Sequence, residues 1–134
     1  MDEHVVAESL TLDAQWVSEL RRGWLALIEV VVWGDIRGLH PGGSGRIRRQ
    51  VVEAGERLRS LTASRDWIPR PRERLKNALA SALGVEEVLE ALAQDAGNLQ
   101  GADVAHLKQA LSQLNALLAQ RLPDLKARWA ALLE

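Results

Sequence analysis

The feature that most constrains the fold is an apolar stripe with helical spacing near the C-terminal end of the sequence. Its members follow one another at steps of three or four residues: Leu107, Leu111, Leu114, Leu118, Leu122, Leu125, Trp129 and Leu132. Side chains at these steps share one face of an α-helix, and that face must be buried against another element. Asp103 is a suitable N-cap for this helical segment.

Pro123 lies within this stripe but does not change its phase. A proline inside a helix removes one hydrogen bond and clashes with the carbonyl four residues earlier, here that of Ala119. The segment is therefore either one kinked helix or two helices that share a face, and we expect two.

The N-terminal part of the chain predicts another helix, with Thr11 as its N-cap and Asp13 in its first turn. Its apolar stripe consists of Val17, Leu20, Trp24, Leu27, Ile28 and Val31. The second half of this helix is apolar nearly all round, which predicts a central place in the fold. The run from Glu29 to Trp33 is rich in β-branched residues, so a strand is the alternative there.

Three more helical segments lie between these. Ser44 is the expected N-cap of a helix whose stripe is Ile47, Val51, Ala54, Leu58 and Leu61. Pro71 suits the first position of the next helix, whose apolar face is Leu75, Leu79, Ala82 and Leu83. Gly84 predicts a break, after which a new stripe is formed by Val85, Val88, Leu89, Leu92 and Ala96.

We therefore predict an all-α fold, a single-domain bundle of four to six mostly antiparallel helices over residues 1–134. Residues 1–10 are expected to be frayed, and residues 38–45 and 62–70 to be connecting loops. The expected interior includes Trp24, Val31, Leu58, Leu79, Leu89, Leu114 and Trp129. The most apolar run, Trp24 to Trp33, is about half the length of a membrane span, and the chain has no cysteine. We expect a cytoplasmic protein without a membrane segment.

Charge is distributed unevenly along the chain. The segment from Arg37 to Lys76 holds ten arginines and one lysine against four acids, while the whole chain has a net charge of −1. Arginine pairs with phosphate or carboxylate through a planar fork of donors, so the segment predicts a surface for an anionic partner. We call its candidate binding residues the basic strip: Arg46, Arg48, Arg49, Arg57, Arg59, Arg65, Trp67, Arg70, Arg72 and Arg74.

Two motifs within this segment have two interpretations each. The stretch Pro41 to Gly45 precedes a helix start and could hold a phosphate, but it lacks the P-loop pattern, and we expect a flexible connection. Trp67 lies among arginines and prolines, as in surfaces that stack on a nucleic-acid base. We expect its indole instead to anchor the loop on the bundle.

No catalytic or metal-binding pattern is present. The three histidines, His4, His40 and His106, are far apart and lack zinc-ligand spacing. Glu29 is the one charge in the central apolar run, and we expect it to point outward or to pair with an arginine. We expect no enzyme activity, no metal and no cofactor.

The leading hypothesis is a non-catalytic helical subunit that binds the backbone of RNA or single-stranded DNA within a larger complex. The alternative is a protein-interaction, adaptor or self-assembling module whose basic strip docks on an acidic protein or on a second copy, forming a homo-oligomer. In size, helicity and charge the chain resembles the small all-helical subunits of CRISPR effector complexes, a resemblance that no motif carries.

Overall fold

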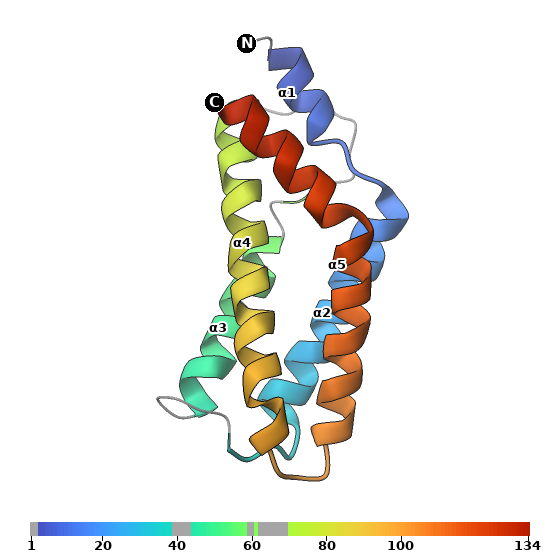
Figure 1. Cartoon of the computed structure of the whole chain (residues 1–134), viewed down its shortest axis with the longest axis vertical. Helices are drawn as coiled ribbons and strands as arrows, with labels where there is room; N and C mark the ends of the chain where they lie inside the picture. Colours follow the sequence, from blue (N-terminus) through green and yellow to red (C-terminus); the bar gives the residue numbers. More distant parts are fainter. Residues whose placement is uncertain (1–2, 39–43, 59–60, 62–69) are drawn as a thin grey trace.

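The computed structural model describes residues 3–38, 44–58, 61 and 70–134, and most of these residues are helical (Figure 1). The elements are α1 (Glu3–Ser9), α2 (Ala14–Trp33), α3 (Ser44–Arg57), α4 (Pro71–Asp95), the short 3-10 helix η2 (Ala96–Asn98) and α5 (Val104–Leu133). The predicted all-α class is confirmed, and the alternative strand from Glu29 to Trp33 is helical. Within the described residues, no helix is both long and apolar enough to cross a membrane.

The four long helices form a ring in which each helix packs against two neighbours. The chain runs down along α2, up along α3, down along α4 and up along α5, so neighbouring helices are antiparallel (Figure 1). The ring closes because α5 packs against α2 as well as α4. Helix α1 packs against α4 and α5 at the end of the bundle that also holds the C-terminus. The predicted antiparallel bundle is thus confirmed.

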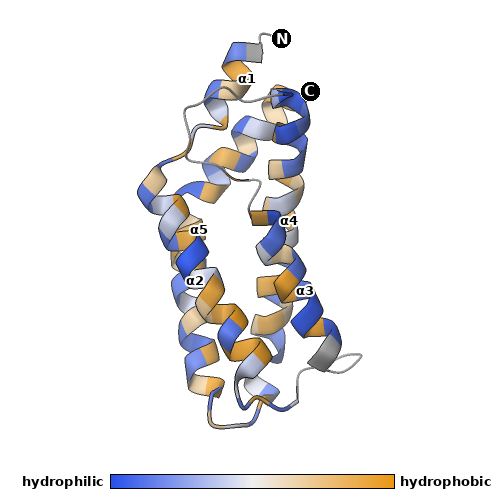
Figure 2. Ribbon diagram, turned by 180° about the vertical axis from the view of Figure 1, so that it is seen from behind, coloured by the Kyte–Doolittle hydropathy of each residue, from blue (hydrophilic) through white to orange (hydrophobic). Residues whose placement is uncertain are grey.

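The core runs the whole length of the bundle because every helix is amphipathic. Hydrophobic and hydrophilic residues recur along each ribbon in Figure 2. Six of the residues predicted inside are buried: Trp24, Val31, Leu58, Leu89, Leu114 and Trp129. Leu79 is partly buried and packs against the same core.

Three buried tryptophans tie neighbouring helices together. Trp16 Nε1 donates a hydrogen bond to the Leu117 carbonyl at 2.8 Å, from α2 to α5. Trp24 Nε1 donates to the Val51 carbonyl at 3.0 Å, from α2 to α3. Trp129 Nε1 donates to the Ser9 carbonyl at 3.3 Å, from α5 to α1. Each indole therefore buries its apolar rings without leaving its N–H unsatisfied.

The N-terminal region differs from the sequence prediction. Residues 3–9, which were expected to be frayed, form α1, and Val6 and Leu10 are buried in the core. The N-cap of α2 is Asp13 rather than Thr11, because Asp13 Oδ1 accepts the Trp16 backbone N–H at 3.0 Å. This hydrogen bond holds the pKa of the Asp13 carboxyl below its usual range. A carboxylate is also favoured at this position by the helix dipole.

Gly84 does not break the third long helix, contrary to the sequence prediction. Helix α4 continues through it to Asp95, because Ala82 and Val85 on either side are buried in one continuous stripe. A glycine inside a helix costs only about 1 kcal/mol, which this burial offsets. Leu83, which was placed on the apolar face, is instead 48% exposed.

Pro123 does not divide the last helix, so the prediction of two helices is wrong. Helix α5 contains Pro123 and bends in its C-terminal part, shown in red in Figure 1. The bend is consistent with the hydrogen bond that proline cannot make. Beyond the bend, Leu125 and Trp129 are buried, and Trp129 reaches α1.

At the other end of the bundle, the residues after α2 are tied to the residues before α5. Arg37 and Gln100 exchange two backbone hydrogen bonds, of 2.7 and 3.0 Å. Asp103, the N-cap of α5, uses its carboxylate to accept the Asp35 backbone N–H at 2.7 Å. That hydrogen bond, and a second from His106, hold the pKa of Asp103 below its usual range. Gly101 has φ of 125° and lies so close to the Asp35 carbonyl that a side chain would not fit.

The two helical glycines at α3 and α4 predict opposite effects of alanine. At Gly84 a Cβ would meet only the end of the Arg57 side chain, at 3.3 Å. Gly84→Ala should therefore raise the free energy of unfolding by about 0.5–1 kcal/mol. At Gly55 a Cβ would lie 2.5 Å from Trp24 Nε1, so Gly55→Ala should lower it by about 1–3 kcal/mol. Urea denaturation measures both, and changes of the same sign would contradict this packing.

Candidate nucleic-acid interface

The described part of the basic strip falls into two groups. Arg46, Arg48, Arg49 and Arg57 belong to α3, and Arg70, Arg72 and Arg74 lie at the start of α4. Arg59, Arg65 and Trp67 lie outside the described residues, as do His40, residues 41–43 of the glycine-rich stretch and nearly all of the predicted loop over residues 62–70. The described part of the candidate interface therefore consists of these two arginine groups.

Three arginines of α3 are free to meet a partner. The predicted stripe from Ile47 to Leu61 is buried, and this burial leaves Arg46, Arg49 and Arg57 exposed. Glu53 is spaced four residues from both Arg49 and Arg57, which suits ion pairing on a helix. Yet within the described chain none of these three arginines forms an ion pair with a carboxylate. Their charge is available to another molecule.

Arg48 has a different role, because it holds the end of α2. Its Nε donates a hydrogen bond to the Val31 carbonyl at 2.8 Å. Val31 lies in the last turn of α2, where carbonyls lack helical partners. The N–H of Asp35, four residues later, donates to Asp103 and not to the Val31 carbonyl. Arg21 acts similarly after α3, where its Nη2 donates to the Leu61 carbonyl at 2.7 Å. Arg48 thereby stabilises the negative end of the α2 dipole, while Arg21 holds the chain that follows α3.

Sequence reasoning assigned Arg48 to the partner surface. A signal for the structural role is nevertheless present, because the last turn of α2 contains no basic residue of its own. Its carbonyls therefore need a donor from elsewhere in the chain.

The second group lies beside the N-terminus of α4. Arg70 is exposed, adopts a left-handed backbone with φ of 50°, and pairs weakly with Glu73 at 3.6 Å. Arg72 is exposed and Arg74 is half-buried. Because the N-terminus of a helix is itself positive, these cations add to the local potential rather than cancel it. Anions are therefore favoured near this end of α4.

Arg57 lies between the two groups. Its Nη1 is 3.3 Å from the position of a Cβ on Gly84, so it crosses from α3 towards the middle of α4. Eleven residues of α3 separate Arg46 from Arg57, and ten residues of α4 separate Gly84 from Arg74. At 1.5 Å per residue, the two groups together extend along roughly 30 Å of the bundle.

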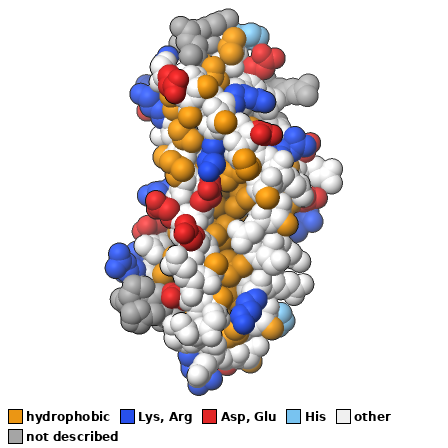
Figure 3. Space-filling model, in the orientation of Figure 1, with side chains coloured by type: hydrophobic (Ala, Val, Ile, Leu, Met, Phe, Trp, Pro, Cys, Tyr) orange, Lys and Arg blue, Asp and Glu red, His pale blue; other side chains and the backbone are white. Residues whose placement is uncertain are grey.

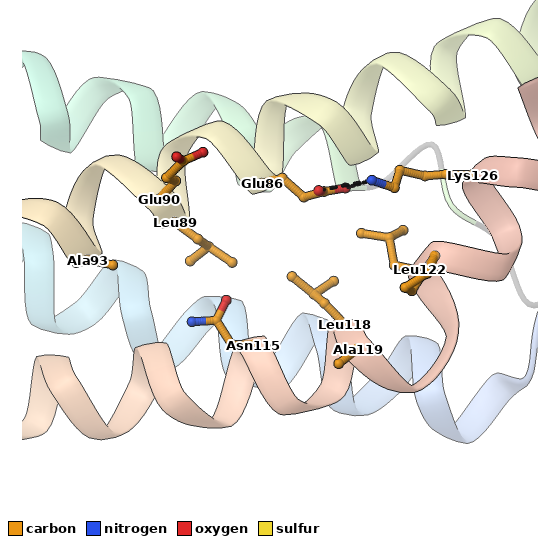
Figure 4. Close-up of a pocket in the computed structure, with 10 residues that line it drawn as sticks. Glu86, Leu89, Glu90, Ala93, Asn115, Leu118, Ala119, Leu122 and Lys126 are labelled. Atoms are coloured by element: carbon orange, nitrogen blue, oxygen red, sulfur yellow. Dashed lines mark hydrogen bonds and ion pairs between the residues drawn. The ribbon is translucent and has the colours of Figure 1, made fainter.

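A separate groove of about 320 Å³ lies between α4 and α5 (Figure 4). Leu89, Leu118 and Leu122 point into it, and Lys126 bridges to Glu86 on the opposite helix with a shortest distance of 2.7 Å. Figure 3 shows the corresponding band of hydrophobic side chains along this face, with basic and acidic side chains scattered around it.

Other candidate residues lie apart from one another. Glu29 is exposed, as predicted, and His106 Nδ1 lies 3.1 Å from Asp103 Oδ1. Among the residues that the structure describes, no three His, Cys, Asp or Glu side chains are grouped as metal ligands. Comparison of the chain with known protein families, curated proteins and solved structures gave no match.

The contrast between Arg48 and Arg49 is testable by matched substitutions. Arg48→Met should lower the free energy of unfolding by about 1 kcal/mol, because the Val31 carbonyl loses its donor. Arg49→Met should change it by less than about 0.5 kcal/mol, since this side chain is exposed. Chemical denaturation of both variants measures the difference. Equal effects would show that the Arg48 hydrogen bond does not stabilise the fold.

Proposed function

We propose that the chain is a non-catalytic helical module that binds the backbone of single-stranded nucleic acid within a larger cytoplasmic complex. The observation that carries this proposal is the set of exposed arginines on α3, Arg46, Arg49 and Arg57, none of which is ion-paired within the described residues. Guanidinium groups bind phosphates, as they bind carboxylates, through pairs of parallel hydrogen bonds.

The shape of the surface supports contact with a backbone. The two arginine groups follow the bundle axis over roughly 30 Å, so they suit a chain of phosphates better than a single small anion. Contacts of this kind fix position and carry no sequence information.

An exposed aromatic side chain favours a single strand over a duplex. Trp33, the last residue of the apolar run that begins at Trp24, is 84% exposed at the end of α2. It lies at the same end of the bundle as the start of α3, because Arg48 holds the carbonyl of nearby Val31. Unpaired bases stack on such indoles, whereas the bases of a duplex are already stacked.

A second candidate function is docking on an acidic protein. Glu53 and Glu56 are exposed among the arginines of α3, which gives this helix a face of mixed charge. An acidic protein also carries basic side chains that can pair with Glu53 and Glu56, whereas every phosphate of a nucleic-acid backbone is negative.

The proposed function predicts a change in salt dependence when two arginines are removed. Arg46→Gln together with Arg57→Gln should flatten the log–log slope of affinity against salt by about 1.4 for single-stranded RNA or DNA. Fluorescence anisotropy with labelled single strands and a labelled duplex measures this slope, and the single strands should bind more tightly. The matched control is Lys108→Gln with Arg128→Gln, which removes the same charge from exposed positions of α5.

Each outcome of this assay is decisive. If the Arg46 and Arg57 variant melts normally and binds with unchanged affinity and slope, the basic strip does not bind nucleic acid. If the control flattens the slope equally, only net charge matters and the proposed surface is wrong.

A further inference from the structure

A second groove, between α2 and α3, exposes apolar side chains of both helices. It has a volume of about 300 Å³, and Trp24, Ile28 and Leu58 line its interior. At its rim Leu25 is 61% exposed and Val52 is 36% exposed. Figure 2 shows α2 and α3 from behind the view of Figure 1, with hydrophobic residues along both ribbons.

The groove is formed by rigid parts of the fold. Gly55 brings α3 so close to α2 that a Cβ there would overlap the Trp24 indole. The same indole donates to the Val51 carbonyl, which fixes the position of α3 against α2. Because this surface is already rigid, a partner would bind it with little loss of conformational entropy.

The charges around the two exposed apolar residues follow one pattern. On α2, Arg22 lies three residues before Leu25 and Glu29 lies four residues after it. Residues three and four apart are neighbours on a helix face, so Leu25 lies between a cation and an anion. On α3 the same spacing recurs, with Arg49 three residues before Val52 and Glu56 four residues after it.

Because α2 and α3 are antiparallel, the two patterns run in opposite directions. Contacts along the pair set their alignment: Arg48 reaches Val31 at one end, and Arg21 reaches Leu61 at the other. Arg22 therefore lies at the same end of the face as Glu56. Glu29 lies at the other end, with Arg49. All four charged side chains are exposed, and none is ion-paired within the described part of the chain.

We propose that this α2–α3 face is the interface of a homodimer with two-fold symmetry. Such an interface must be complementary to itself, since each copy presents the same surface. The face meets that requirement, because Arg22 and Arg49 alternate with Glu29 and Glu56 around an apolar centre, and the further cation of the groove, Arg21, is held by the Leu61 carbonyl. A partner of one charge would leave two of the four charged groups opposed by like charge.

Two orientations of the symmetry axis satisfy the charges. With the axis parallel to the helices, Arg22 meets Glu56 of the second copy and Glu29 meets its Arg49. With the axis across the helices, Arg22 meets Glu29 of the second copy and Arg49 meets its Glu56. Leu25 and Val52 lie at the centre in both arrangements, where their burial provides the apolar contribution to association.

The homodimer does not rest on the proposed nucleic-acid function, although Arg49 belongs to both surfaces, because Arg46 and Arg57 belong to the nucleic-acid surface alone. Arg57 lies on the flank of α3 that faces α4, away from the groove, and Arg46 precedes it by about three helical turns. Substitutions at these two arginines therefore test binding of nucleic acid, and substitutions in the groove test association.

Sedimentation equilibrium of the full chain tests the proposal. The wild-type chain should pass from monomer to dimer over about a hundredfold range of concentration. Leu25→Glu and Val52→Glu should each shift the chain to monomer, since each places a charge in the apolar centre. Leu83→Glu, an equally polar change at an exposed leucine of α4, should leave the dimer intact. Circular dichroism melting confirms that each variant is folded.

A wild-type chain that stays monomeric, or a Leu83→Glu variant that dissociates as readily as Leu25→Glu, would overturn the proposal.

Charge reversal then identifies the axis. Glu56→Arg should weaken the dimer at least several-fold. Adding Arg22→Glu should restore association if the axis is parallel to the helices, and adding Arg49→Glu should restore it if the axis lies across them. If neither second substitution restores the dimer, the charge pairing proposed here is wrong.

Discussion

The arrangement of this bundle depends on hydrogen bonds from three buried indoles to main-chain carbonyls of neighbouring helices. Trp16, Trp24 and Trp129 each bury a large aromatic surface, and each has an N–H that needs an acceptor in the interior. Leaving such a donor unsatisfied costs about 1–3 kcal/mol. Sliding one helix against its neighbour, or rotating it about its own axis, would move the acceptor out of line with the indole N–H, so these contacts favour one alignment among many that would bury similar apolar area.

This alignment decides which side chains are left for partners. With Trp24 held against Val51 and Gly55, the α2–α3 pair exposes Leu25 and Val52 at the rim of a groove. It also brings Arg48 to the end of α2, where the guanidinium serves the fold. The neighbouring Arg49 has no such partner in the described chain. Arginines next to each other in the sequence thus have different roles, because a step of about 100° separates them around the helix.

Much of the fold follows from the spacing of apolar residues. The stripe from Ile47 to Leu61 and the stripe from Leu107 to Leu125 are buried as the pattern predicts. The predictions at Gly84 and Pro123 were wrong because a local preference for a break competes there with burial on both sides, whereas at Thr11 the cap is supplied by Asp13 instead. At Gly84 and Pro123 the continuous buried stripe keeps the chain helical. The glycine and the proline destabilise the helix by a few kcal/mol, which is too little to end it there. Residues 3–9 and Leu83 also differ from the pattern.

The sequence predicted less of the candidate sites. It indicated exposed arginines on α3, but the hydrogen bond from Arg48 to Val31 depends on which helices become neighbours. The exposure of Trp33 was also missed, because an apolar run does not show where a helix extends beyond its neighbours. The groove between α2 and α3 requires the antiparallel pairing that only the structure supplies.

Hydrogen exchange of the tryptophan indole N–H groups, followed by NMR, tests the role of the three buried indoles most directly. The indoles of Trp16, Trp24 and Trp129 should exchange slowly, as donors within a closed core do, while that of Trp33, 84% exposed, should exchange quickly. Substituting each tryptophan by phenylalanine assigns the signals. If the three buried indoles exchange as fast as that of Trp33, their hydrogen bonds do not fix the alignment of the helices.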